Sequence, residues 1–246
     1  MDINKNVIAN LRAQYGDAFY LLDSAQFRNN FQELKESFNK IYPKWNIAYS
    51  YKTNYTPKLC NIVNELGGYA EVVSEMELEI AKRVGCKAER IIWNGPIKNP
   101  KIVEAFLLEG GCVNIDSIEE LEMVKDIHQR HPETLLNVGI RCNYDVQDGV
   151  ISRFGFDIDG DDFKAAVAFA VATNYVKLVN FQCHFAKRQI DYWPARAKGM
   201  VELIDRLGII PERIDIGGGL FGKMAASLKA QFSSEIPDYA AYAKAA

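Results

Sequence analysis

The sequence contains few residues that would hold a metal ion or form a disulfide scaffold. It has three histidines in 246 residues, and two of them, His128 and His131, lie at the end of a charged segment. A metal centre built on histidine is therefore not expected. The cysteine count is odd and includes no Cys-x-x-Cys pair, which indicates reduced, buried thiols. The five cysteines are Cys60, Cys86, Cys112, Cys142 and Cys183.

The sequence also lacks a long apolar segment and a basic net charge. Its first five residues contain no basic stretch followed by apolar residues, and its longest apolar run, 165–172, is far shorter than the roughly 18 residues of a membrane span. The formal net charge of -3 gives no electrostatic basis for non-specific nucleic-acid binding. We therefore expect a cytoplasmic protein with neither a membrane nor a nucleic acid as partner.

What is present is the composition of a folded domain, with 48% hydrophobic and 25% charged residues, and an alternation of two patterns. Short β-branched or aromatic runs alternate with segments whose apolar residues recur at spacings of three and four. The predicted strands are 19–23, 46–52, 69–73, 90–93, 112–115, 136–141, 176–184 and 213–216. The predicted helices include 24–41, 56–66, 74–84, 117–129, 161–172 and 192–207, with helical patterns also in 224–231 and 237–246.

This alternation predicts parallel strands joined by helices, in a closed (β/α)8 TIM barrel or in an open doubly wound sheet. No Gly-x-Gly-x-x-Gly motif follows the first strand, so a dinucleotide fold is not favoured. Polar residues or glycines follow nearly every predicted strand. In a barrel these residues would converge on one mouth, which favours the barrel, with 19–23 as one of eight strands.

Lys52 ends the run Ala48-Tyr49-Ser50-Tyr51-Lys52 and is the first candidate catalytic residue. A lysine buried at a barrel mouth loses part of its proton affinity, and its free amine is then the nucleophile that forms a Schiff base. The alternative is a solvated lysine just beyond the end of a strand.

The glycines Gly217, Gly218 and Gly219 follow the last predicted strand. They form either an amide nest that binds phosphate, as is common late in a βα series, or a flexible turn. His184 ends another strand, where its ring would stack on a planar cofactor or exchange a proton, or would only be hydrogen-bonded.

Four further charged residues have both a functional and a structural explanation. Arg141 would pair with a phosphate or carboxylate in the mouth, or with Asp145 or a neighbouring strand end. Glu71 lies at a strand end, while Glu77 belongs to a Ser-x-x-Glu capping box that already explains its type. Arg153 lies in a loop and would equally form a surface ion pair. Taken together, the candidate residues match the requirements of pyridoxal 5'-phosphate.

The sequence resembles the fold-type III pyridoxal-phosphate decarboxylases, the group that includes diaminopimelate, ornithine, arginine and carboxynorspermidine decarboxylases. Six matching motifs occur in the order found in that family. They are Tyr49-Ser50-Tyr51-Lys52-Thr53-Asn54, Ala70-Glu71-Val72-Val73-Ser74-Glu75-Met76-Glu77-Leu78, Asn114-Ile115-Asp116-Ser117, Ser152-Arg153-Phe154-Gly155, Cys183-His184-Phe185 and Asp215-Ile216-Gly217-Gly218-Gly219.

The resemblance implies that Lys52 holds pyridoxal 5'-phosphate as an internal aldimine and that His184 stacks on its ring. It implies that Gly217, Gly218 and Gly219 bind the phosphate. It places Glu71, Glu77 and Arg141 near the cofactor. It implies that Arg153 helps to position the partner subunit's active-site loop. Lys187 stands where relatives have a phosphate-contacting serine, so Lys187 and Arg188 would pair with phosphate or with an acidic substrate.

The resemblance also implies an architecture and an activity. The strand 19–23 would belong to a second domain, so that 1–23 forms an N-terminal helix and strand, and 24–246 forms the cofactor-binding barrel without its eighth strand and without the C-terminal β-domain. The implied activity is decarboxylation of a basic or diamino acid by a homodimer, with the 246-residue chain itself inactive. The alternatives are a non-catalytic or regulatory homologue that binds pyridoxal phosphate and an amino-acid racemase.

Overall fold

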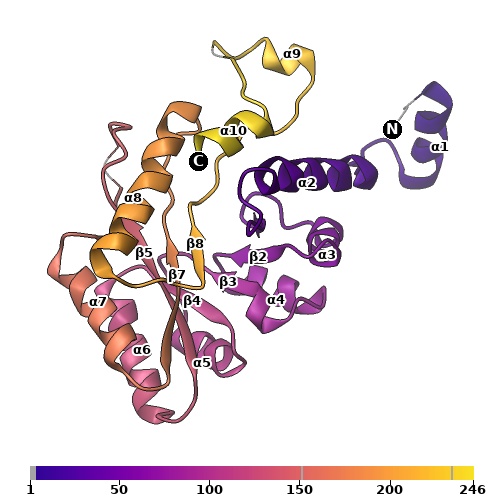
Figure 1. The fold of residues 1–246 in the computed structure, drawn as a ribbon. Coiled ribbons are helices and arrows are strands. Elements are labelled where there is room, and N and C mark those ends of the chain that lie inside the picture. The colour runs from indigo at the N-terminus through magenta and orange to yellow at the C-terminus, as the bar shows by residue number, and fades with distance from the viewer. Residues whose placement is uncertain (1–3, 151, 234) are drawn as a thin grey trace.

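The computed structural model of the chain describes residues 4–150, 152–233 and 235–246. Its centre is a curled parallel sheet with strands in the order β1-β2-β3-β4-β5-β7-β8, as Figure 1 shows, and β6 pairs with β5 outside this path. The strands are β1 Ala48–Ser50, β2 Tyr69–Val72, β3 Ile91–Trp93, β4 Cys112–Ile115, β5 Leu136–Asn143, β6 Phe156–Asp157, β7 Val176–Gln182 and β8 Arg213–Asp215.

Helices follow the strands and pack around the outside of the curled sheet, while α1 projects away from the rest of the molecule (Figure 1). The α-helices are α1 Lys5–Tyr15, α2 Ser24–Asn39, α3 Pro57–Glu65, α4 Glu75–Arg83, α5 Pro100–Leu108, α6 Ile118–Arg130, α7 Asp161–Ala172, α8 Trp193–Leu207, α9 Ala226–Lys229 and α10 Tyr239–Ala245. Two short 3-10 helices are η1 Ala88–Arg90 and η2 Ile190–Tyr192.

Seven of the eight predicted strands form, each within two residues of its predicted ends, and the six predicted helices between 24 and 207 form with similar accuracy. The parallel strands carry near-continuous apolar runs because both faces of such a sheet are covered. Their side chains and those of the outer helices form the main core, which includes the fully buried Trp93, Phe106 and Phe181.

The predicted closed barrel of eight strands is wrong. The segment 19–23 forms no strand, and Tyr20 within it is fully exposed. A segment with a strand pattern forms a strand only where another strand pairs with it through hydrogen bonds. The segment 19–23 leads into α2, whose N-cap is Asp23. The sheet therefore stays open, with β1 and β8 as its edges. This architecture confirms the incomplete (β/α)8 barrel that the resemblance implies.

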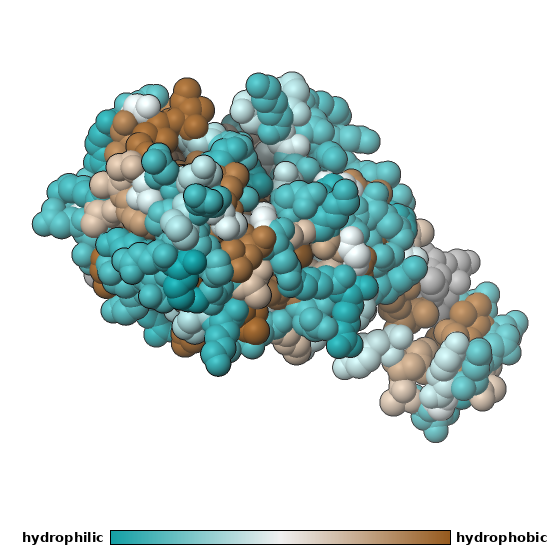
Figure 2. Space-filling view, turned by 90° about the horizontal axis from the view of Figure 1, so that it is seen from below, coloured by the Kyte–Doolittle hydropathy of each residue, from teal (hydrophilic) through white to brown (hydrophobic). Residues whose placement is uncertain are grey.

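The last helix, α10, is held by a second, smaller core. Tyr242 packs edge-on against Trp193 of α8 at 5.0 Å between ring centroids, and Phe38 of α2 stacks on Trp45 at 4.2 Å. These contacts bring the end of the chain over the loops that follow β7 and β8. Figure 2 views the molecule from below Figure 1, on the side away from α10, and shows a largely hydrophilic surface interrupted by smaller apolar groups. Within the described ranges, no helix is both long and apolar enough to cross a membrane.

Candidate functional site

The carboxyl ends of the strands bring the candidate residues to one edge of the sheet. Parallel pairing sets Ser50 of β1 beside Glu71 of β2. Lys52 lies two residues beyond β1, and His184 lies two residues beyond β7. Since the carboxyl ends of parallel strands share one edge, these side chains lie at the same mouth.

Lys52 lies in the turn after β1, with an exposed side chain. Thr53 closes this turn, because its N–H and its hydroxyl donate to the carbonyl of Ser50 at 3.2 and 2.7 Å. The positive charge of Lys52 lowers the pKa of His184 and of Asp215, so the three groups interact electrostatically. Of the two interpretations of Lys52, the solvated lysine just beyond the end of a strand is the one observed, because the residue lies beyond the last position of β1, where solvent reaches it.

Three carboxylates interact electrostatically near Lys52. Burial raises the pKa of Glu77 and raises that of Asp215 to about 6, and the charge of Glu71 raises both further. Lys52 opposes this effect by lowering the pKa of Glu77 and of Asp215. The mouth therefore brings carboxylates and a cationic amine into one electrostatic group. No cluster of acidic, cysteine or histidine side chains in the described part of the chain is arranged to hold a metal ion.

The Glu77 carboxylate is fixed by the start of α4. The Ser74 hydroxyl accepts a hydrogen bond from the N–H of Glu77 at 3.3 Å, and Glu77 Oε2 accepts one from the N–H of Val73 at 2.7 Å. The capping box predicted here thus forms, with the carboxylate reaching one residue further back than the N-cap. The structural explanation of Glu77 is confirmed, and its carboxylate is buried beside the mouth.

His184 is largely covered and neutral near neutral pH. Burial, together with the positive charges of Lys52 and Arg141, lowers its pKa to about 4. Its Nδ1 atom accepts a hydrogen bond from the N–H of Gly218 at 3.4 Å, which leaves the proton on Nε2. A neutral, oriented imidazole presents a flat face to a ligand without adding positive charge.

The three glycines after β8 form an open loop beneath His184. Gly217 and Gly219 have φ angles of +74° and +95°, which residues with a Cβ rarely adopt. A Cβ on Gly217 would lie 2.5 Å from the carbonyl oxygen of Cys183, whereas one on Gly218 would meet nothing within 4 Å. The first glycine is therefore required for close packing, and the second borders open space. Such a loop suits a phosphate group, because backbone N–H groups can approach it without obstruction.

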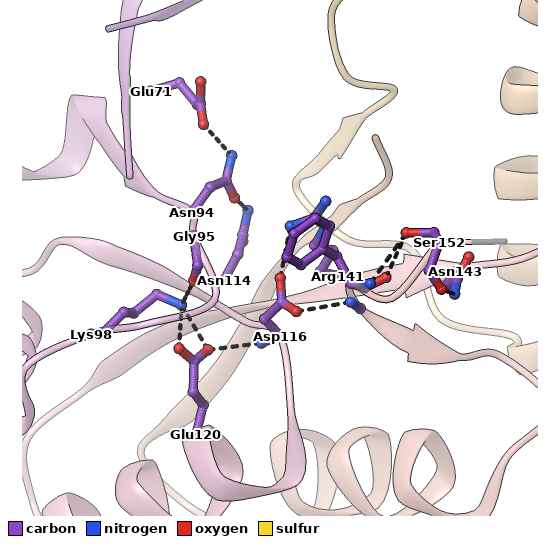
Figure 3. A network of polar contacts seen from close by, with 12 residues as sticks. Glu71, Asn94, Gly95, Lys98, Asn114, Asp116, Glu120, Arg141, Asn143 and Ser152 are labelled. Carbon is purple, nitrogen blue, oxygen red and sulfur yellow. Dashed lines mark hydrogen bonds and ion pairs between the residues drawn. The ribbon is translucent and has the colours of Figure 1, made fainter. Parts of the chain in front are cut away.

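Arg141 lies at the end of β5 and is held by Asp116, as Figure 3 shows. Its Nη1 atom donates to Asp116 Oδ2 at 2.7 Å, and its guanidinium lies over the ring of Phe154 at 4.9 Å. The other oxygen of Asp116 accepts from the N–H of Gly155 at 2.8 Å. Arg141 therefore pairs with a neighbouring strand end, since Asp116 directly follows β4, and this is one of the partners expected from the sequence. The charge of Arg141 also lowers the pKa of His184, so Arg141 borders the same site.

A chain of side-chain amides crosses the sheet from Glu71 (Figure 3). Asn94 Nδ2 donates to Glu71 Oε1 at 2.9 Å, and Asn114 Nδ2 donates to Asn94 Oδ1 at 2.5 Å. The side-chain amides of Asn114 and Asn180 form a further hydrogen bond at 2.9 Å. All four residues are buried. Since an unpaired buried carboxylate is costly, this chain holds Glu71 in one orientation.

A second buried network joins the loop after β3 to the start of α6 (Figure 3). Lys98 Nζ lies 2.6 Å from Glu120 Oε2, and the Lys98 side chain is fully buried. The same Glu120 oxygen accepts from the N–H of Asp116 at 2.8 Å. Burial raises the pKa of Glu120 and lowers that of Lys98, and the pairing opposes both shifts. This ion pair supports Asp116, which in turn holds Arg141.

The other cationic candidates lie around the mouth. Arg153 lines a cavity of about 730 Å³ together with Asp116 and Phe154, and its guanidinium lies over the Phe154 ring at 5.0 Å. Lys187 and Arg188 follow His184 and lie over aromatic rings, Tyr192 at 5.5 Å and Phe221 at 6.0 Å. Lys52 and His184 do not line the cavity of Arg153.

Sequence reasoning missed the roles of four residues. Asp215 was seen only as part of a motif, although its place two residues before three glycines is a usable signal. Asn114 and Asn180 interrupt apolar strands, a pattern typical of polar groups that point into a barrel. Arg196 occupies a core position on α8, and a charged residue in an apolar helix stripe is a signal of the same kind.

Comparison with known proteins gives consistent matches over most of the chain. Residues 25–243 match the family described as pyridoxal-dependent decarboxylase, pyridoxal binding domain. The chain is 28% identical over 225 residues to a diaminopimelate decarboxylase from Aquifex aeolicus, covering 85% of this chain and 52% of that protein. It is 27% identical over 229 residues to the enzyme of the same name from Methanocaldococcus jannaschii, with the same two coverages.

A solved structure agrees with these sequence matches. The crystal structure of a diaminopimelate decarboxylase from M. jannaschii superimposes with a TM-score of 0.83 at 25% identity, covering 96% of this chain and 57% of that one. The chain therefore spans about half the length of the curated relatives it matches.

Proposed function

This chain belongs to the pyridoxal-dependent decarboxylases, through the pyridoxal binding domain of that family, and on this premise we propose that Lys52 binds pyridoxal 5'-phosphate for amino-acid decarboxylation. The observation that carries the proposal is the meeting of Lys52, His184 and the three glycines at one mouth of the sheet. An accessible amine, a neutral ring and an open loop of backbone N–H groups are the parts that an aldehyde with a planar ring and a phosphate requires.

The glycine loop fits this cofactor in two ways: it is concave, and its N–H groups would bind a negatively charged phosphate. The open space at Gly218 and the positive φ of Gly219 leave a concave loop in which the N–H groups of Gly219 and Leu220 have no hydrogen-bond partner among the described residues. Unpaired N–H groups in a glycine loop favour an anion such as phosphate. The Oε1 atom of Gln182 and the Oγ atom of Ser50, both near the mouth, are also buried without a partner in the described part of the chain.

When bound, pyridoxal phosphate supplies a ring that accepts the electron pair left when carbon dioxide departs. Lys52 would hold the group through its Nζ atom until the amine of the substrate replaces it. Asp215 and Glu77, whose carboxyl groups have raised pKa values, exchange protons with these amines. His184 keeps a neutral face toward the ring, and Arg141 supplies positive charge beside it.

We propose a diamino acid as the substrate class. The two relatives described above are both named diaminopimelate decarboxylases, which supports this class. The carboxylates of Glu71, Glu77 and Asp215 also support this class, because each of them would pair with a second cationic amine of the substrate.

We also propose a second domain, a homodimer and a cytoplasmic location for the whole protein. Tyr20, Leu21 and Leu22 are exposed and apolar in the segment 19–23, which supports its packing against another domain. Arg153 lines an open cavity at the mouth, which supports its contact with a loop of a partner subunit. The five cysteines are buried free thiols, as expected of a protein in a reducing compartment.

The test uses the whole protein, because the 246-residue chain is expected to be inactive by itself. It supplies pyridoxal 5'-phosphate with diaminopimelate, lysine, ornithine or arginine and measures carbon dioxide release. Release from a diamino acid, lost in Lys52→Ala and kept in Lys58→Ala, supports the proposal. Lys58 is an exposed lysine of α3 and serves as the matched control. Cofactor binding without release would favour a non-catalytic homologue, and exchange of enantiomers without release would favour a racemase.

A further inference from the structure

Arg196 is a charged residue at a core position of α8. It lies on the same helix face as Trp193, Met200 and Leu203, and all four are buried. The exposed fraction of Arg196 is 0%. An arginine is rarely buried without a partner, so its contacts identify what it does.

The Arg196 guanidinium joins the two loops at the mouth of the sheet. Its Nη1 atom donates to the carbonyl of Gly218 at 2.9 Å, and its Nη2 atom donates to the carbonyl of Lys187. Gly218 belongs to the loop after β8, and Lys187 belongs to the loop after β7. The planar guanidinium group is well suited to joining two loops, since its two Nη atoms hold two carbonyl acceptors in a fixed relative geometry.

The positive charge of Arg196 is not neutralised locally. It forms no ion pair with any carboxylate in the part of the chain that the structure describes. Among the acids, Asp148 interacts electrostatically with Arg196 and raises its pKa, against the lowering by burial, but the two form no ion pair among the described residues. The Nε atom is buried and has no hydrogen-bond partner among the described residues. Aromatic rings surround the guanidinium, Trp193 at 5.0 Å and Phe185 at 5.8 Å. A buried cation without a counter-ion is costly and would be stabilised by an anion nearby.

The bonds to the two carbonyls also fix two N–H groups. In a planar trans peptide the C=O and the following N–H point in opposite directions. Holding the carbonyl of Gly218 therefore turns the N–H of Gly219 away from Arg196, and holding the carbonyl of Lys187 does the same for the N–H of Arg188. Neither N–H forms a hydrogen bond with any described residue.

Tyr242 of α10 provides a second tie between the same loops. Its hydroxyl donates to the carbonyl of Arg188 at 2.9 Å and accepts from the N–H of Phe221 at 3.4 Å. The loops after β7 and β8 are thus joined by two side chains, Arg196 at Lys187 and Tyr242 at Arg188, and only Arg196 is charged.

We propose that Arg196 is a positioning residue for the phosphate of the cofactor: it orients the N–H groups of Gly219 and Arg188 toward the phosphate and supplies a buried positive charge behind them. The inference rests on the proposed function. It assigns to a helix residue outside the family motifs the task of shaping the phosphate site.

The test compares pyridoxal 5'-phosphate with pyridoxal, which lacks the phosphate, as ligands of the full chain. The ratio of the two affinities, measured by absorption titration, isolates the contribution of the phosphate. We expect Arg196→Met to lower this ratio by roughly tenfold or more while the pyridoxal affinity changes little, because the N–H groups of Gly219 and Arg188 lose their fixed orientation and the phosphate loses a buried positive charge behind them. Arg196→Lys keeps the positive charge but not the planar guanidinium group, and it should lower the ratio by a smaller factor. Lys198→Met removes an exposed charge from the same helix and should leave the ratio unchanged.

An unchanged ratio in Arg196→Met would overturn the inference while leaving the proposed function intact. An equal loss of affinity for both ligands would also overturn it, since that result indicates a general structural role. If Arg196→Met does not fold, Arg196→Lys decides, and an unchanged ratio there has the same consequence. A wild-type chain that binds neither ligand, or binds both equally, would contradict the proposed function itself and the inference with it.

Discussion

The side chain of Asn114 occupies the position where a side chain on Gly139 would lie. A Cβ on Gly139 would be 1.8 Å from Asn114 Oδ1 and 3.0 Å from the Cβ of Asn180. The absence of a side chain in the middle of β5 therefore lets Asn114 of β4 reach Asn180 of β7 across it. This contact extends the amide chain that holds Glu71 at the mouth of the sheet.

The first prediction follows from that contact. Gly139→Ala should destabilise the chain by about 2–4 kcal/mol, because the backbone of three paired strands cannot move apart to admit a methyl group. Chemical denaturation measures the loss. Gly222→Ala is the control, since a Cβ there meets nothing within 4 Å. The double variant Gly139→Ala with Asn114→Ala should recover part of the stability, and a full additive loss would show that the two residues do not compete for space.

The buried ion pair gives the second prediction. Lys98→Met should cost about 3–5 kcal/mol, because it leaves the Glu120 carboxylate buried without its cation. Removing the exposed partner of an ordinary surface pair, in Lys164→Met, should cost less than about 1 kcal/mol. Urea unfolding of both variants measures the difference. Equal losses would contradict the account of Lys98 as the cation that supports the start of α6.

Asp215 gives the third prediction, which concerns pH. In the folded chain the pKa of Asp215 is about 6, above the ordinary value of 3.8. Between pH 3.8 and about 6 the folded chain therefore binds more protons than the unfolded chain. The Asp215 carboxyl group therefore destabilises the fold progressively as the pH rises from about 4 to about 6. Asp215→Asn should be more stable than the wild type by about 1–2 kcal/mol near pH 7 and nearly equal to it near pH 4.

Urea unfolding at the two pH values tests this prediction, with Asp205→Asn, an exposed carboxylate on α8, as the control. A loss of stability in Asp215→Asn near pH 7 would mean that its charge is needed by the fold.

His184 gives the fourth prediction. Its pKa is lowered to about 4, so the unfolded chain binds more protons between about pH 4 and 6.5. Its contribution to stability is present above this window and is lost as the pH falls through it. An NMR titration of the imidazole should place its midpoint near pH 4. A midpoint at or above 6.5 would mean that the ring is charged in the site and is not the neutral surface inferred here.

The sequence predicted the architecture well where one local pattern decided it. The apolar runs of β4 and β5 and the amphipathic pattern of α7 located these elements to within two residues. The segment 19–23 shows the limit of such patterns, because its aromatic and apolar run is typical of a strand while no strand in the described part of the chain pairs with it. Strand formation depends on pairing, which a local pattern does not contain.

The candidate site was predictable where a motif placed a residue directly at a strand end. Lys52, His184 and the three glycines were found in this way, and they do meet at one mouth. Their supports were not predictable, because the contacts of Arg196 with Gly218 and Lys187 join separate loops. Such contacts arise only from the folded geometry.

The central claim is that Lys52 is the residue that binds the cofactor. The most direct measurement adds pyridoxal 5'-phosphate to the chain, reduces the lysine linkage with borohydride to a stable secondary amine, and maps the labelled peptide by mass spectrometry. The account predicts a single label on Lys52 that is absent in Lys52→Arg and kept in Lys58→Arg. A label on another lysine, or no label on any lysine, would contradict it.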